Sequence, residues 1–218
     1  MRIKFLGHAA FLITTSAGKK IVTDPYEPGG YGGAIAHGKL TEPADFCTIS
    51  HNHSDHNCVK MVPGNPTVIQ QAGEVQEEDI LFRSLLTHHD RSRGSERGQN
   101  TVRIIEADGL TVCHLGDLGH PVGPEDATAL GHINVLLIPV GGNFTIDAAG
   151  ATAVINRLRP NIAIPMHYRS AKVSFDIAPV DDFLLGKKTV RRVAGSEIEV
   201  EKDSLPEPTE IVVLEPAL

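Results

Sequence analysis

A short stretch that follows an apolar run carries a high density of metal-binding residue types. The segment ISHNHSDHNC, residues 49–58, holds His51, His53, Asp55 and His56 within six positions. Neutral imidazole and carboxylate are the groups that bind a borderline divalent metal such as zinc. His51 and His53, two residues apart on an extended segment, can face the same way, and Asp55 and His56 after a turn can reach a second position. The spacing therefore favours two metal ions over one.

A solvated turn is the alternative interpretation of this segment, with Asp55 as the N-cap of a short helix. Three further apolar runs argue against it, because each also ends in a residue type that binds metal. These endings are His88 and His89 after RSLLT, Asp117 after TVCHLG, and His167 after IAIPM. We therefore predict a metal site built from the ends of strands.

The segments that position these side chains are short runs bounded by Gly, Pro, Asn or Asp, which is typical of strands. Helical spacing is clearest in TIDAAGATAVINRLRP, where Asp147 can cap the first turn and Pro160 ends the run. Shorter helices are predicted near Pro124 and in IAPVDDFLLGKK, with Gly186 as a stop. A strand-rich first half followed by alternating strands and helices predicts one α/β layered domain over residues 1–218. Strands are predicted at 2–7, 10–15, 20–24, 46–51, 67–71, 80–89, 101–109, 110–117, 133–142, 161–168 and 211–215.

Composition bounds the class of protein. The 218 residues, 41% of them hydrophobic, are enough for a large core, and a formal charge of -7 offers no basic field to nucleic acid. The N-terminal segment MRIKFLGHAAFLITT has neither a signal cleavage site nor a membrane-spanning apolar run. The chain has an odd number of cysteines without CxxC spacing, which fits reduced thiols; they are Cys47, Cys58 and Cys113. We expect a cytoplasmic protein without a membrane partner.

The motifs together resemble a known family. HNHSDH reproduces the HxHxDH motif of the metallo-β-lactamase superfamily. VTDPY, HLGDLGH and IPMHY look like the branch of small metal-dependent hydrolases related to the L-ascorbate-6-phosphate lactonases. The similarity runs from FLGHAAFLI to at least IPMHY. It implies a four-layer αββα sandwich with the metals in a cleft at one edge, where loops of both sheets meet.

The resemblance also implies a ligand set for two divalent metal ions. Asp117 would bridge the two ions. Imidazole-rich ligation fits zinc best, with manganese, nickel and iron as alternatives. The first ion would be held by His51, His53 and a later histidine, and the second by Asp55, His56 and His167.

The later histidine is one of two neighbours, His88 and His89. Adjacent residues of a strand point to opposite faces, so only one of them should enter the site. Family members that resemble this chain place a histidine directly before the aspartate that is Asp90 here, which favours His89. Asp24 resembles the family's supporting carboxylate, which would orient a metal ligand.

The remaining polar residues have weaker assignments. His8 and Tyr168 are candidate cleft groups that could hold a substrate oxygen, or they could be packing residues. We expect most of the other histidines, His37, His114, His120 and His132, to be structural.

Two dications can lower the pKa of a shared water and polarise a carbonyl or phosphoryl group, so the expected reaction is hydrolysis of an ester, lactone, amide or phosphoester. Asp55, Asp117 and His8 are the expected catalytic residues. Asp117 stands where the true β-lactamases have a cysteine, so we do not expect an antibiotic-degrading enzyme.

Other activities occur on the same fold. Diiron oxidoreductases of the fold replace the second histidine of the motif, here His53, with glutamate. Nucleases of the fold carry an insertion that does not fit between Asp117 and His167. A binding module with a degraded site is a third alternative, although every expected ligand type is present.

The expected partner is a small-molecule substrate. Arg91, Arg93 and Arg97 in DRSRGSERGQN could bind an anionic group of it, or this segment could be a solvated hairpin loop. The glycine-rich stretch EPGGYGGAIAHGKL is either a flap over the cleft or a plain surface loop. A homo-oligomer is possible, since the related lactonases assemble.

Overall fold

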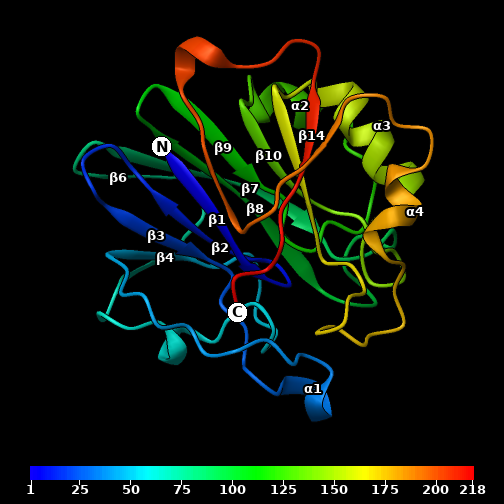
Figure 1. Ribbon diagram of the computed structural model, residues 1–218, viewed down its shortest axis with the longest axis horizontal. Helices are drawn as coiled ribbons and strands as arrows, with labels where there is room; N and C mark the ends of the chain where they lie inside the picture. The colour runs from blue at the N-terminus through cyan, green and yellow to red at the C-terminus, as the bar shows by residue number, and fades with distance from the viewer.

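Two β-sheets packed face to face form the centre of the protein, for which a computed structural model describes residues 1–218 (Figure 1). The first sheet has six strands in the order β13-β1-β2-β3-β4-β5. Its strands are β1 (Arg2–Gly7), β2 (Ala10–Thr14), β3 (Lys20–Thr23), β4 (Phe46–Thr48), β5 (Thr67–Ile69) and β13 (Glu197–Glu199).

The second sheet has eight strands in the order β12-β14-β11-β10-β9-β8-β7-β6. The five strands from β12 to β9 pair in parallel, and those from β9 to β6 pair antiparallel. They are β6 (Glu74–Glu77), β7 (Ile80–His88), β8 (Gln99–Ala107), β9 (Leu110–His114), β10 (Val135–Pro139), β11 (Ile162–Met166), β12 (Val190–Arg192) and β14 (Glu210–Val213).

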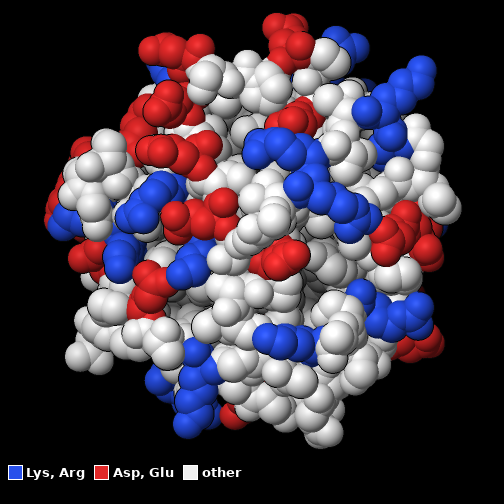
Figure 2. Space-filling view, in the orientation of Figure 1, with Lys and Arg blue, Asp and Glu red and all other residues white.

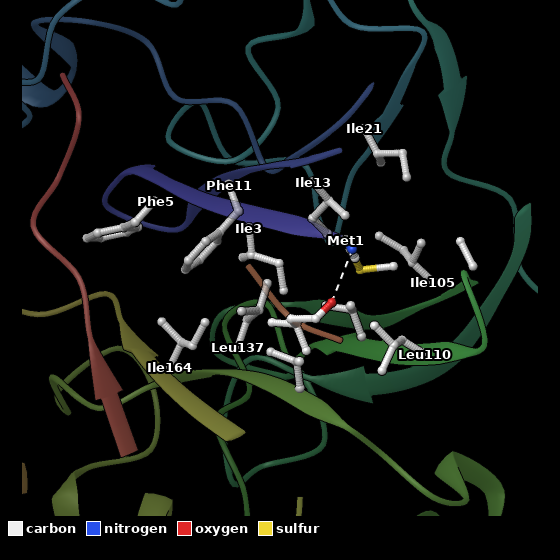
Figure 3. Close-up of a cluster of buried hydrophobic side chains, with 14 of the residues drawn as sticks. Met1, Ile3, Phe5, Phe11, Ile13, Ile21, Ile105, Leu110, Leu137 and Ile164 are labelled. Atoms are coloured by element: carbon white, nitrogen blue, oxygen red, sulfur yellow. Dashed lines mark hydrogen bonds between the residues drawn. The ribbon is translucent and has the colours of Figure 1, made fainter. Parts of the chain in front are cut away.

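The main core fills the space between the two sheets. In β1, Ile3 and Phe5 point inward while Arg2 points to solvent, as the two-residue period of a strand requires. The ring of Phe5 packs against that of Phe11 at 5.0 Å between centroids. Side chains from β8 to β11 meet them from the other sheet, among them Ile105, Leu137 and Ile164 (Figure 3).

The outer faces of the two sheets are covered in different ways. Helices α2 (Pro124–Leu130), α3 (Ala148–Leu158) and α4 (Val180–Leu184) pack on the eight-stranded sheet (Figure 1). The other sheet is covered by the loop segment 25–63, which contributes Tyr26 and Ile35 to a third apolar cluster. This layer holds only α1 (Gly30–Gly33) and a 3₁₀ helix (Val59–Met61). The expected α/β sandwich with layers outside both sheets is confirmed, with a thin helical layer on this side.

The individual elements largely match the sequence expectations. Every predicted strand is present, and α3 begins after Asp147, whose side chain accepts a hydrogen bond from the Gly150 backbone. Three short polar strands, β6, β12 and β13, were not predicted, because only pairing with a neighbouring strand makes them extended. A second 3₁₀ helix (Lys202–Ser204) lies in the predicted C-terminal loop. None of the helices combines the length and apolar character that crossing a membrane requires.

The strand directions bring distant segments together. In the first sheet β1, β3 and β4 run the same way, and in the second β7, β9 and β11 do. Each of these strands ends just before a residue predicted for the site. The residues that follow them are His8, Asp24, His51, His89, Asp117 and His167.

A buried arginine links the two sheets beside these strand ends. Arg103 on β8 is 4% exposed and has no carboxylate partner. Its Nε donates to Ile49 O at 2.7 Å, and its two terminal nitrogens donate to Gln71 O at 2.8 Å and Gln70 O at 2.7 Å. Ile49 is two residues before His51, so this contact positions the histidine segment.

We expect Arg103→Ala to lower the free energy of unfolding by about 3 kcal/mol, because the buried Ile49 carbonyl and the part-buried Gln70 and Gln71 carbonyls lose a charged donor. Arg2→Ala is the matched control, since Arg2 is half-exposed and its ion pair with Glu197 should contribute less than about 1 kcal/mol. Urea unfolding followed by circular dichroism measures both. Equal unfolding midpoints for the two variants would contradict a structural role for Arg103.

Candidate metal centre

Three imidazoles form the first ligand group. His51 and His53 come from the segment after β4, and His89 directly follows β7. Their candidate ligand atoms all lie within 4.8 Å of one another. His51 Nε2 and His53 Nδ1 are 3.0 Å apart. The group is the one predicted for the first metal ion.

A second group lies beside it and is more deeply buried. It contains His8, Asp55, His56 and His167, whose ligand atoms also lie within 4.8 Å of one another. His8 Nε2 is 3.1 Å from Asp55 Oδ2, and the His8 side chain is only 2% exposed. Three members are those predicted for the second ion, and His8 lies within the group and not at its mouth.

The Asp117 carboxylate lies between the two groups. Its Oδ2 is 3.2 Å from His89 Nε2 and 3.9 Å from His51 Nε2 in the first group. The same oxygen is 3.3 Å from His56 Nε2 and 3.4 Å from His167 Nε2 in the second. Asp117 Oδ1 and His56 Nε2 are buried and lack hydrogen-bond partners. Unpaired buried ligand atoms at the centre of a histidine and carboxylate cluster fit divalent cations.

Charge balance supports the same conclusion. Asp24, Asp55 and Asp117 are at most 6% exposed, and their only ion-pair partners are histidines. Burial opposes the charged form of Asp117, but His167 and His56 outweigh it and hold the pKa of this carboxyl well below its ordinary value. Burial likewise acts against protonation of His56, yet Asp117 and Asp55 raise its pKa well above the usual range. The carboxylates therefore require positive charge at this position.

His51 has the opposite environment. Burial, followed by the neighbouring His56, lowers the pKa of His51 to about 3. The imidazole of His51 is thus neutral at physiological pH, which is the form that binds a metal ion.

Neighbouring polar residues hold the ligand side chains in their orientation. Asp24 Oδ1 accepts from the Ser50 backbone at 2.8 Å, and Asp24 Oδ2 lies 2.9 Å from His56 Nδ1. The Ser50 hydroxyl donates to Asp24 and lies 2.8 Å from His51 Nδ1. Asp24 and Ser50 therefore orient one ring from each ligand group.

The loop that carries Asp117 is closely packed against its neighbours. The Asp117 backbone nitrogen donates to Asn100 Oδ1 at 2.9 Å. A Cβ on Gly119 would lie 2.3 Å from the backbone carbon of His89. Only glycine permits the two ligand-bearing loops to approach this closely.

Comparison with known proteins agrees with the metal site that the geometry indicates. Residues 2–167 match the sequence profile of the β-lactamase superfamily domain. The chain belongs to the β-lactamase superfamily. A UPF0173 metal-dependent hydrolase of Pyrococcus abyssi is 30% identical over 195 residues, 78% of this chain and 85% of the relative. One from Carboxydothermus hydrogenoformans is 29% identical over 196 residues with the same coverage.

A crystal structure from Thermotoga maritima extends this superfamily relationship over nearly the whole chain. That protein is a proposed Zn-dependent hydrolase of the metallo-β-lactamase superfamily, 36% identical to this chain. The TM-score is 0.79, and the match covers 98% of each chain. The two-sheet fold of this chain is therefore that of the superfamily.

Residues outside the superfamily motif occupy other environments. His88 contacts His120, with ring centroids 5.7 Å apart, and belongs to neither ligand group. The ring of Tyr168 packs against the core near Phe5. His37 and His114 are buried and bind the backbone oxygens of Leu218 and Ala9, and His132 lies beside Asn134.

Sequence reasoning missed three residues that contact the centre. These are Ser50, Asn100 and Tyr31, whose hydroxyl donates to Asp55 Oδ1 at 3.1 Å. Ser50 directly precedes His51, so its position next to the motif was an available signal. Asn100 and Tyr31 are brought to the site from other segments. The glycine-rich stretch that holds Tyr31 was a candidate flap, but no role was predicted for Tyr31 itself.

We expect His89→Ala to weaken zinc binding by more than about tenfold, since loss even of a supporting partner has an effect of this size. His88→Ala is the matched control and should bind zinc like the wild type, because His88 belongs to neither ligand group. Competition with a chromogenic chelator measures the affinities. The reverse result would show that His88 is the ligand.

Proposed function

We propose that this chain is a dinuclear metal-dependent hydrolase that cleaves an ester, lactone or phosphoester bond. The observation that carries the proposal is the position of Asp117 Oδ2, within 3.9 Å of four Nε2 atoms that belong to two ligand groups. A carboxylate between two such groups is suited to bridge two cations and to offset their mutual repulsion. The proposed ions are zinc, since five of the seven proposed ligands are imidazoles.

The first ion would be held by His51, His53 and His89, and the second by Asp55, His56 and His167, with Asp117 shared. Bound divalent cations would supply a water nucleophile near neutral pH and would polarise the scissile bond. His8 would hold the Asp55 carboxylate, which it contacts at 3.1 Å.

The residues behind the ligands would fix their orientation. Each of three rings has its Nδ1 beside a protein oxygen: His51 at Ser50, His56 at Asp24, and His89 at the Phe144 carbonyl at 3.1 Å. When Nδ1 carries the proton, Nε2 presents its lone pair toward Asp117. Metal binding would displace any proton on Nε2, while the contacts at Nδ1 would keep the three rings in the same orientation.

Observations at the site and on the surface favour this activity over the alternatives. His53 stands in the first ligand group where the diiron oxidoreductases of the fold have glutamate. The segment between Asp117 and His167 consists of α2, β10, α3 and β11 with short connections, which does not favour a nuclease insertion. Lys and Arg side chains are interspersed with Asp and Glu on the face in Figure 2. We infer a small-molecule substrate, and the three buried, unpaired cysteines support a cytoplasmic setting.

Zinc content is the first test. Protein dialysed against excess zinc and then desalted should contain about two ions per chain by plasma mass spectrometry, as two ligand groups imply. His132→Ala, which removes an exposed imidazole, should leave this content unchanged. Saturation at one ion per chain would reject the dinuclear centre.

Asp117→Asn tests the shared carboxylate. This substitution keeps the shape but removes the charge, so the second ion should bind more weakly. Hydrolysis of the best compound in a screen of lactones, carboxylate esters and phosphodiesters should fall by about two orders of magnitude. Asp126→Asn on α2 is the matched control. Full activity with two bound ions in Asp117→Asn would exclude the bridging role.

A further inference from the structure

Three aromatic side chains stand in a row beside the candidate metal centre, and the proposed reaction does not use them. Tyr31 lies in α1, Phe144 and Phe175 lie in two separate loops, and neighbouring rings meet edge to face. The centroids are 5.4 Å apart for Tyr31 and Phe175 and 5.9 Å apart for Phe175 and Phe144. The chain has seven Phe, three Tyr and no Trp, so three of its ten large aromatic side chains gather here. We call them the aromatic row.

The aromatic row contacts both ligand groups. The Tyr31 hydroxyl donates to Asp55 Oδ1 at 3.1 Å, and the ring of Phe175 lies 5.7 Å from that of His8. At the other end, the Phe144 carbonyl lies 3.1 Å from His89 Nδ1. The row therefore follows the metal centre from the second ligand group to the first.

Exposure distinguishes the row from the core. Tyr31 is 52% exposed, one of only three large hydrophobic side chains that the fold leaves exposed, and Phe144 and Phe175 are partly buried. Tyr31 and Phe144 belong to none of the three core clusters. Phe144, at one end of the row, and His89 also line a cavity of about 350 Å³ whose other lining residues are mostly polar or charged. Aromatic surface beside a few convergent polar groups is typical of a small-ligand site.

The Tyr31 end of the row is open to a ligand. Tyr31 has φ of 51°, an unfavourable conformation for a residue with a Cβ. No atom lies within 4 Å of a Cβ built on Gly29, Gly32 or Gly33, so these positions face open space. The Tyr31 side chain contacts Asp55 through its hydroxyl and Phe175 through its ring.

We propose that the aromatic row binds a flat, ring-containing apolar group of the substrate, next to the bond that the metal centre cleaves. The proposal rests on the hydrolase function proposed above and specifies its substrate class as aryl or cyclic esters, lactones or phosphoesters. A ring of the substrate can pack on the edges and faces of the row, whereas a methyl group is too small to cover it.

The arginine segment is a weaker candidate for substrate recognition. Arg91 and Arg97 line the cavity beside Phe144, but Asp90, Glu96 and Asp147 line it too. Arg97 is already paired with Glu96 at 3.7 Å. The opposing charges leave no net attraction for an anion from these side chains, so the apolar row decides the preference.

Phenylphosphonate and methylphosphonate test the proposal on the zinc-loaded protein, because they share a metal-binding head and differ only in the ring. We expect calorimetry to give at least about tenfold tighter binding of phenylphosphonate, the ratio that burial of a Phe-sized ring supports. Phe144→Ala and Tyr31→Ala should each reduce the ratio severalfold. Tyr31→Phe keeps the ring without the hydroxyl and should retain the ratio, as should Leu185→Ala at an exposed apolar residue outside the row.

The outcomes separate this proposal from the function on which it rests. Equal affinity for the two phosphonates, or a ratio unchanged in both alanine variants, would reject the aromatic row as a substrate surface and leave the hydrolase proposal standing. If neither phosphonate binds the zinc-loaded protein, both proposals fail. Light scattering on the same samples tests whether a second copy of the chain covers the row. A wild-type dimer that Phe144→Ala dissociates would assign the row to an interface between copies and overturn the proposal.

Discussion

Three carboxylates, those of Asp24, Asp55 and Asp117, are buried at one edge of the molecule, and neither lysine nor arginine pairs with any of them. Removing a carboxylate from water is costly unless donors or positive charge meet it. Here the charge must come from imidazoles and from cations that the imidazoles can share. The positions of the surrounding histidines, and of the strands that deliver them, follow from this requirement. A fold that failed to bring the rings to these carboxylates would leave buried charge uncompensated.

The common direction of six strands meets that requirement. Residues from positions 8 to 167 converge because β1, β3 and β4 in one sheet, and β7, β9 and β11 in the other, end at the same edge. The two sheets must also keep a fixed position relative to each other at this edge. Arg103 fixes the loops after β4 and β5 to β8, and the absent side chain of Gly119 lets the Asp117 loop lie against His89. The packing of the two sheets therefore sets the positions of the ligands.

The centre and its surroundings differ in how firmly they are held. Asp117 and His56 are buried, and Asp24 and Ser50 support the rings of His56 and His51. The segment with Tyr31 contains three glycines at which a side chain would meet open space, and its tyrosine is half-exposed. A buried centre beside an open apolar surface suits a hydrolase, because the reacting groups need a defined geometry while different substrates need different contacts.

The sequence by itself determined the ligand types and the strands that carry them. HNHSDH needs no tertiary information, because four metal-binding side chains within six residues already indicate a metal site, and the apolar period of β7 to β11 is a local signal. The sequence by itself left His88 and His89 open; the resemblance to the family favoured His89, which lies in the first ligand group. The short strands β6, β12 and β13 could not be predicted, since three or four polar residues become extended only through a partner strand.

Only the tertiary structure decided which distant side chains complete the centre. Asn100 on β8 supports the Asp117 backbone from the strand that pairs with β9, and Tyr31 reaches Asp55 from a glycine-rich segment. His8 lies inside the second ligand group because the turn after β1 directs it there. The physical reason is the same in each case. A hydrogen bond or a ring contact between residues far apart in the chain depends on how strands pair and how loops and sheets pack, and no local pattern of residues encodes that distance.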